Sequence, residues 1–151
     1  MSRMPVRLVR VEGSTEVSMD VYDFESSGTS VADDVRALKT SYDEMIRAVK
    51  PILAGKPSTT ERWRASRRIV EFADGHSKFR ITNFAAACAR DMESGANIPL
   101  LMRFGHEFSE GELDDSIPYT RYRNLVLKRS ELLRLGTYES ERARLVRTAP
   151  A

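Results

Sequence analysis

The stretch that decides the fold is residues 78–108, KFRITNFAAACARDMESGANIPLLMRFGHEF. Its first four residues, 78–81, alternate charged and apolar side chains, which is typical of a short strand. Phe84, Cys88 and Met92 then recur every fourth residue, the spacing of one face of a helix. We therefore expect a short strand that leads directly into a helix.

A second helix follows a tight turn at residues 93–97, in which Gly95 would stop the first helix. Asn97 is a favoured N-cap residue, and Pro99 falls in the first turn of a helix, where proline is tolerated. The buried face of this helix would consist of its large apolar residues, Leu100, Leu101, Phe104 and Phe108. Residues 78–108 thus predict the order strand, helix, turn, helix.

A further helix is predicted just before this stretch. Ser58 and Glu61 have the spacing of a capping box, and Gly75 is typical of a helix C-cap. With this helix in front, the order resembles a helix-turn-helix of the winged type over about residues 58–117. The resemblance implies that the helix after the turn enters the DNA major groove and that the short strand pairs with a following hairpin, the wing. The chain departs from the pattern at residues 110–115, which are acidic where a DNA-contacting wing is usually basic.

Upstream, residues 31–52 carry a seam of three heptads. Apolar side chains recur there at alternating spacings of four and three residues: Val31, Val35, Leu38, Tyr42, Met45, Val49 and Ile52. The seam predicts one long amphipathic helix that Pro51 ends or kinks near Lys50. This helix either packs within its own chain or dimerises as a coiled coil, and the lack of a regular charge pattern beside the seam favours the first.

The two ends of the chain are predicted separately. At the N-terminus, residues 6–11 and 17–24 have the composition of strands, and the turn-like residues 12–15 would join them into a β-hairpin. At the other end, residues 118–135 predict a helix, followed by a mostly polar helix from Thr137 to near Arg147.

Arg129 stands out because helical spacing places it inside the apolar arc of the predicted 118–135 helix. A buried arginine requires a partner, since an unpaired one costs several kcal/mol. We consider three explanations: it pairs with an acid such as Glu112 or Asp115, it marks an interface, or the helix has a different phase.

The predicted fold is mainly α: an N-terminal β-hairpin followed by a bundle of five or six helices with a helix-turn-helix or winged-helix-like core. We divide the chain into a hairpin and linker at 1–28, a long amphipathic helix at 29–55, and a helical domain at 56–151. The core of that domain lies at about 58–117. A chain of 151 residues is long enough for one well-packed domain.

The formal charges nearly cancel, because 24 Lys and Arg face 22 Asp and Glu. They are nevertheless segregated. Residues 56–80 carry a net charge of +4 and residues 121–147 carry +5, whereas residues 104–120 carry −5 and residues 1–28 carry −2. Of the 24 basic residues 19 are arginine, whose planar guanidinium suits phosphate and guanine.

These basic blocks on either side of the motif predict a non-catalytic nucleic-acid-binding protein, a regulator of transcription or a genome-maintenance factor. It would bind DNA or RNA as a homodimer, through the 31–52 helix or the N-terminal hairpin. The phosphate contacts would come from the flanking basic residues, Arg64, Arg67, Arg68, Lys78 and Arg80. The predicted recognition helix would turn Arg103 and His106 toward the groove.

The alternative is a small helical adaptor, or a subunit, whose basic faces meet an acidic protein partner. The acidic 110–115 segment and the very apolar helix at 99–108 favour this reading. Tyr119, Tyr122 and Arg123 suit stacking on nucleotides, although a tyrosine at a helix start more often serves packing.

Other functions find little support in the sequence. The single cysteine, Cys88, lies on an apolar face, which favours a buried structural role over a nucleophilic one. Neither His76 nor His106 has the neighbours of a metal site, so we expect no metal, no cofactor and no catalytic residue. We also expect no signal peptide and no membrane span, and we expect the protein in the cytoplasm.

Overall fold

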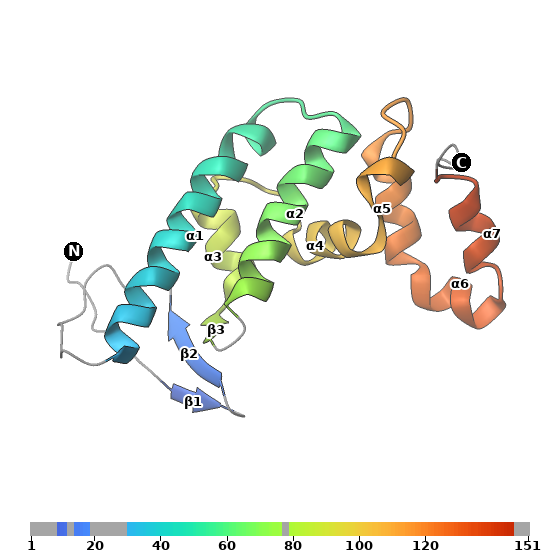
Figure 1. Ribbon diagram of the computed structural model, residues 1–151. Coiled ribbons are helices and arrows are strands. Elements are labelled where there is room, and N and C mark those ends of the chain that lie inside the picture. The colour runs from blue at the N-terminus through green and yellow to red at the C-terminus, as the bar shows by residue number, and fades with distance from the viewer. Residues whose placement is uncertain (1–8, 12–13, 19–29, 77–78, 147–151) are drawn as a thin grey trace.

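The computed structural model describes residues 9–11, 14–18, 30–76 and 79–146, and its fold is mainly helical (Figure 1). The elements follow in the order β1 (Val9–Val11), β2 (Ser14–Ser18), α1 (Ser30–Ala54), α2 (Thr59–Gly75), β3 (Phe79–Thr82), α3 (Phe84–Asp91), α4 (Ile98–Glu107), the 3-10 turn η1 (Glu110–Glu112), α5 (Tyr119–Leu127), α6 (Arg129–Leu135) and α7 (Tyr138–Ala143). One hydrophobic core runs through this structure and takes residues from every α-helix except α6.

Helix α1 buries its heptad seam against its own chain. The side chains of the seam from Val35 to Val49 are 5% exposed or less: Val35, Leu38, Tyr42, Met45 and Val49. The helix lies side by side with α2 (Figure 1), so these residues pack within the chain and are not free to form a coiled coil with a second copy. Packing inside the chain, the favoured interpretation of the seam, is therefore confirmed.

Pro51 does not end α1, which continues to Ala54, so of the two predicted effects of this proline the helix end is wrong by about one turn. Proline removes one backbone hydrogen-bond donor and crowds the carbonyl four residues earlier. In the last turn of a helix this cost is small, and the next two side chains, Ile52 and Leu53, still pack against the core.

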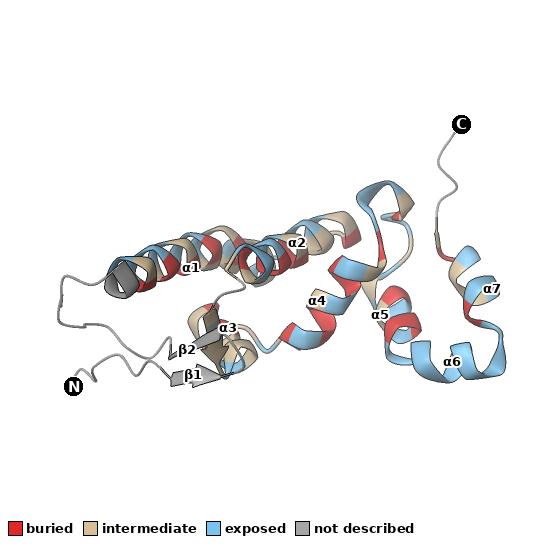
Figure 2. Cartoon of the chain, turned by 60° about the horizontal axis from the view of Figure 1, so that its bottom comes forward, coloured by how far each residue is buried: buried red, intermediate tan, exposed pale blue. Residues whose placement is uncertain are grey.

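Helices α2 and α4 begin where the sequence signals predict. The Ser58 Oγ accepts from the Glu61 backbone N–H at 3.1 Å, and the Glu61 carboxylate accepts from the Ser58 N–H at 3.0 Å, which completes the capping box. Asn97 caps α4 by accepting from the Leu100 N–H at 3.1 Å. Helix α4 packs against α2, α3 and α5, and its buried residues make it the centre of the molecule (Figure 2).

The sheet has the order β1–β2–β3, with β1 and β2 antiparallel and β2 and β3 parallel. The short strand predicted at 78–81 is observed as β3. In the N-terminal segment the second strand begins at Ser14 rather than Val17, and the predicted strand residues 6–8 and 19–24 lie outside the described residues.

The strand β3 pairs with β2, which precedes it, and not with a hairpin that follows α4. Residues 108–118, where the resemblance implies a wing, form η1 and loop without any strand. Their Asp, Glu, Gly and Pro residues disfavour strands. In addition, Ser109 and Glu112 form a local capping box that starts the turn. The wing is thus not found at this position.

The single helix predicted over 118–135 is divided at Lys128 into α5 and α6. None of the residues of α6 is buried, and this helix stands at the edge of the structure (Figure 2). Gly136 ends α6 in a left-handed conformation with a φ of 75°, which is typical of a glycine at a helix end. Among the described helices, none combines the length and the apolar composition needed to cross a lipid bilayer.

Candidate nucleic-acid interface

The acidic segment after α4 pairs with both basic blocks of the sequence. On one side, Glu110 accepts from the Arg64 Nε at 2.6 Å. On the other, Glu112 accepts from two nitrogens of Arg142, at 2.7 and 3.1 Å. The segment that argues against a DNA-contacting wing therefore serves as an internal counterion for arginines of α2 and α7.

A third acid of this segment, Asp115, binds the start of α2. Asp115 accepts from the Thr60 backbone N–H at 2.8 Å and from its hydroxyl at 2.7 Å. These hydrogen bonds hold the pKa of the Asp115 carboxyl below its usual range. Asp115 thus satisfies an N–H in the first turn of α2, where a negative charge is stabilised by the helix dipole.

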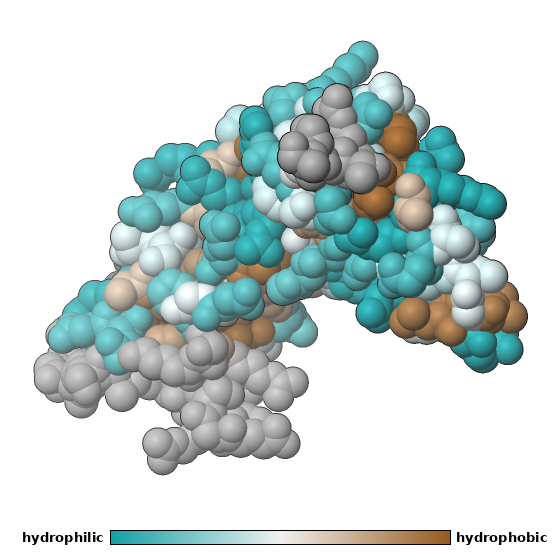
Figure 3. All heavy atoms as spheres, turned by 45° about the vertical axis from the view of Figure 1, so that its right-hand side comes forward, coloured by the Kyte–Doolittle hydropathy of each residue, from teal (hydrophilic) through white to brown (hydrophobic). Residues whose placement is uncertain are grey.

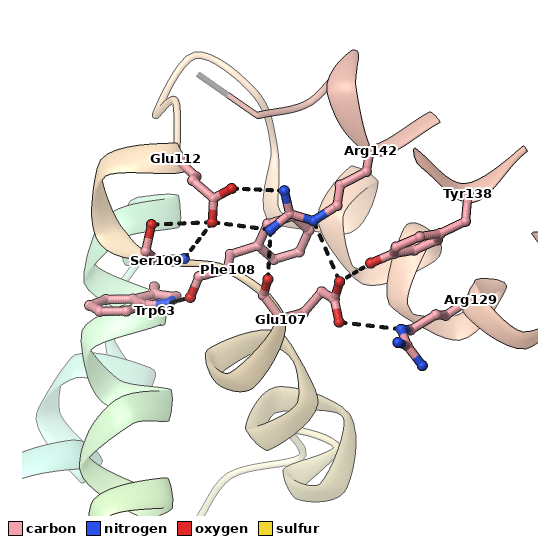
Figure 4. Close-up of polar contacts among 8 residues, drawn as sticks. All are labelled: Trp63, Glu107, Phe108, Ser109, Glu112, Arg129, Tyr138 and Arg142. Carbon is pink, nitrogen blue, oxygen red and sulfur yellow. Dashed lines mark hydrogen bonds and ion pairs between the residues drawn. The ribbon is translucent and has the colours of Figure 1, made fainter. Parts of the chain in front are cut away.

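Arg142 attaches α7 to the end of α4 (Figure 4). Besides its two hydrogen bonds to Glu112, it donates to the Glu107 carbonyl at 2.8 Å and lies 4.9 Å from the centre of the Phe108 ring. The Arg142 hydrogen bonds lower the pKa of Glu112, and Glu112 in turn raises the pKa of Arg142. This cluster is structural in character, because its donors and acceptors are already paired within the chain.

Arg129 belongs to the same cluster, with a partner that differs from the two expected. Its Nε lies 3.4 Å from the Glu107 carboxylate, and its guanidinium lies over the Tyr138 ring at 5.4 Å. The side chain is 47% exposed, because the break at Lys128 changes the helix phase. Two of the three explanations therefore hold: Arg129 pairs with an acid, although the acid is Glu107, and the helix has a different phase.

Three of the seven predicted nucleic-acid contacts, Arg64, Arg67 and Arg103, are bonded within the chain. Arg64 pairs with Glu110, and Arg67 donates to the Gly105 carbonyl at 3.3 Å. Arg103 donates to the Val126 carbonyl at 2.9 Å and so caps the end of α5 instead of facing outward freely. Arg68 and His106 are exposed. The side chains of Lys78 and Arg80 lie outside the described residues.

A different pair of arginines faces a hollow at the N-terminal end of α4. The hollow has a volume of about 510 Å³ and lies between α2, the α3–α4 turn and α5. Its polar lining includes Arg62, Asn97, Thr120 and Arg123, and its walls include Tyr119. The Arg62 guanidinium lies 4.6 Å from the centre of the Tyr119 ring. Arg62 and Arg123 thus reach this space from two different helices.

Both arginines lack an anionic partner in the described part of the chain. Their Nε atoms are buried without a hydrogen-bond partner, the only side-chain nitrogens or oxygens among the described residues in that condition. Burial raises the pKa of the Tyr119 hydroxyl, and the two positive charges oppose that rise, so both act on the same ring. A buried donor without an acceptor costs about 1–3 kcal/mol, and more when the group is charged. An anion in the hollow would relieve that cost.

The hollow also adjoins a helix start, where backbone N–H groups and the helix dipole favour negative charge. Two guanidiniums can bind phosphate oxygens through paired, charge-assisted hydrogen bonds. The sequence does not identify Arg62, because nothing local distinguishes it from the other arginines of α2. Only the packing of α5 against α4 brings Arg123 to the same hollow as Arg62.

Other chemistry finds no support among the described residues. Burial raises the pKa of the Cys88 thiol to about 12, which suits a structural residue rather than a nucleophile. The described side chains include no group of three His, Cys, Asp or Glu suited to a metal ion. No family model, no curated protein and no solved structure matches the chain.

Proposed function

We propose that this protein binds a nucleic acid without catalysis, as a regulator or genome-maintenance factor, and that phosphates bind at the hollow between Arg62 and Arg123. The observation that carries the proposal is the pair of buried Nε atoms without acceptors at the start of α4. A phosphodiester supplies both the acceptors and the negative charge that this space lacks.

The position of the hollow suits the helix-turn-helix-like unit made of α2, α3 and α4. In proteins of that architecture the N-terminal residues of the second helix of the motif lie nearest the bases, while neighbouring positive charges hold the backbone. A phosphate bound by Arg62 and Arg123 would bring a duplex close to the exposed Pro99 at the start of α4.

The same surface offers few groups that read bases. Asn97 is occupied by its capping hydrogen bond to the Leu100 N–H, Pro99 has no N–H, and Arg103 is bonded to the Val126 carbonyl. We therefore propose binding that follows the phosphate backbone and depends little on sequence. A cytoplasmic homodimer formed through the N-terminal strands would supply a second contact.

The test is the binding of a fluorescent 20-base-pair duplex, followed by anisotropy at two salt concentrations. Substituting both arginines, Arg62→Gln with Arg123→Gln, should weaken binding about tenfold or more and reduce the slope of log K against log salt by about 2. The matched control is Arg47→Gln with Arg68→Gln, which removes the same charge from exposed positions on α1 and α2.

The control pair also compares the hollow with the surface predicted from the sequence, because Arg68 is one of the phosphate contacts predicted there. If both double variants lose the same affinity, net charge alone carries binding and the hollow has no special role. Full retention of affinity in the Arg62 and Arg123 variant would refute the proposal. Wild-type binding weaker than about 100 µM at 50 mM salt would also refute it, because non-specific binding is stronger than about 100 µM even at physiological salt.

A further inference from the structure

A second concave surface lies on the other side of α5. Helices α5, α6 and α7 enclose a groove of about 410 Å³, which is within the ~300–1,000 Å³ range of many ligand sites. Its apolar lining comes from α5, from α6 and from the segment after α7: Leu125, Leu132 and Leu145. Its charged rim consists mainly of Arg121, Lys128 and Arg144.

The helix that forms one wall of this groove has little cover within the chain. None of the residues of α6 is buried, although three of its seven residues are leucines. Leu133 and Leu135 are 47% and 57% exposed. Figure 3 shows apolar surface at this lower right edge of the molecule, surrounded by polar side chains. Apolar surface rimmed by polar groups is typical of an interaction site.

The charges around the groove indicate which occupant fits. Arg121 and Lys128 form no ion pair among the described residues, and Arg144 lies 3.3 Å from Glu141, the single acid in the lining. Residues 119–146 carry seven basic and three acidic side chains, a net charge of +4. A second copy of this face would bring positive charge against positive charge, which disfavours association. An acidic occupant is complementary.

We infer that the groove binds an acidic amphipathic helical segment of a partner protein. Apolar side chains at helical spacing would enter between Leu125, Leu132 and Leu145, the arrangement by which amphipathic helices occupy apolar grooves. Carboxylates beside them would pair with Arg121 and Lys128. The groove and the hollow at Arg62 and Arg123 share no lining residue, so they are separate sites.

The probe is a fluorescent 16-residue peptide with leucines at helical spacing i, i+3, i+4 and i+7 and glutamates between them. Its control has the same charge, with each leucine replaced by serine. Anisotropy with the full-length protein should show micromolar binding of the first peptide and at least tenfold weaker binding of the second. Equal binding of the two peptides would mean that charge alone attracts them, and the inference would be wrong.

Variants locate the binding. Leu132→Asn, and separately Arg121→Gln with Lys128→Gln, should each weaken peptide binding about tenfold or more, while circular dichroism confirms that they fold. Arg47→Gln with Arg68→Gln removes the same charge from α1 and α2 and should leave peptide binding unchanged. The Leu132→Asn variant should also bind the DNA duplex like the wild type, which separates this site from the proposed function.

Two further results would contradict the inference. One is full peptide affinity in both groove variants, which places the peptide elsewhere. The other is a wild-type dimer in light scattering that Leu132→Asn converts to a monomer, because the occupant would then be a second copy of this chain.

Discussion

Glu93 adopts a backbone conformation that favours glycine. Its φ is 51°, and it follows the C-cap Met92 of α3. The Ser94 N–H bonds to the Ala89 carbonyl at 3.0 Å and the Glu93 N–H to the Arg90 carbonyl at 3.1 Å, the two hydrogen bonds of a Schellman motif. The sequence pattern places the end of this helix at Gly95, two residues too late, because glycine marks such positions more often than glutamate.

Glu93→Gly should therefore stabilise the protein, since glycine adopts positive φ without steric cost. We expect the melting temperature to rise by about 3 °C relative to a Glu93→Gln variant. The comparison with glutamine is necessary because Glu93 also lies 2.6 Å from the Lys50 ammonium, and both substitutions remove that exposed ion pair. A glycine variant that melts no higher than the glutamine variant would show that the turn is not strained.

At the scale of single elements, the attachment of α7 depends on the charge of Glu112. Its carboxylate receives two hydrogen bonds from Arg142 and one from the Ser109 N–H at 2.9 Å. These lower the pKa of Glu112 below the ordinary value of 4.5. Because the folded-state pKa is below that of the unfolded chain, ionised Glu112 favours folding above pH 4.5, and this contribution is lost as the pH falls through the folded-state pKa.

Glu112→Gln should accordingly lower the melting temperature at pH 7, and the difference from wild type should be smaller at pH 3. Thermal unfolding followed by circular dichroism between these pH values measures how the difference in melting temperature between variant and wild type decreases. Glu131→Gln, at an exposed position of α6, is the control and should show no such convergence. A gap that stays constant with pH would mean that Arg142 and Glu112 do not interact through charge.

The elements that sequence patterns predict correctly are those that neighbouring residues specify. The Ser58–Glu61 capping box, the Asn97 cap and the seam of α1 each depend on residues within one or two turns of each other. The break between α5 and α6 depends on distant residues instead. Arg103 of α4 donates to the Val126 carbonyl and satisfies a helix end that local sequence does not mark.

The candidate site was harder to predict for the same reason. The charge blocks along the chain indicate that arginines contribute to binding. They do not show which arginines remain without a carboxylate partner once the acidic segment has folded between them. Arg64 is neutralised by Glu110, whereas Arg62, two residues earlier on α2, faces a hollow without a carboxylate. That difference arises from the direction each side chain takes on the helix and from where η1 and α5 pack.

At the scale of the whole molecule, α4 joins two halves, one that contains α2 and α3 and one that contains α5. It packs against α2 and α3 and also against α5, where the buried Phe104 contacts the Tyr122 ring. Gly105 lies where α4 crosses α2 most closely. A Cβ atom at this position would lie 2.5 Å from the Ser66 Oγ and 3.2 Å from the Ser66 Cβ. Ser66 is fully buried, so it has little room to move away.

Gly105→Ala tests this crossing, because the substitution has two effects of opposite sign on the stability of the protein. Alanine is favoured over glycine in a helix interior by about 1 kcal/mol. Overpacking a close helix contact costs about 1–3 kcal/mol, so we expect a net loss of stability. Urea unfolding followed by Trp63 fluorescence and by circular dichroism should show the same shift with both probes, since α4 packs against both halves.

The decisive comparison repeats the substitution in a Ser66→Gly background, where the clashing Oγ and Cβ atoms are gone. The nearest remaining atom, the backbone carbon of residue 66, lies at 3.4 Å, which is ordinary contact. Helix propensity then acts alone, and Gly105→Ala should become stabilising by up to about 1 kcal/mol. The reversal of sign is specific to a steric contact between these two positions. A destabilisation of equal size in both backgrounds would place the cause elsewhere, in a requirement of α4 itself for glycine.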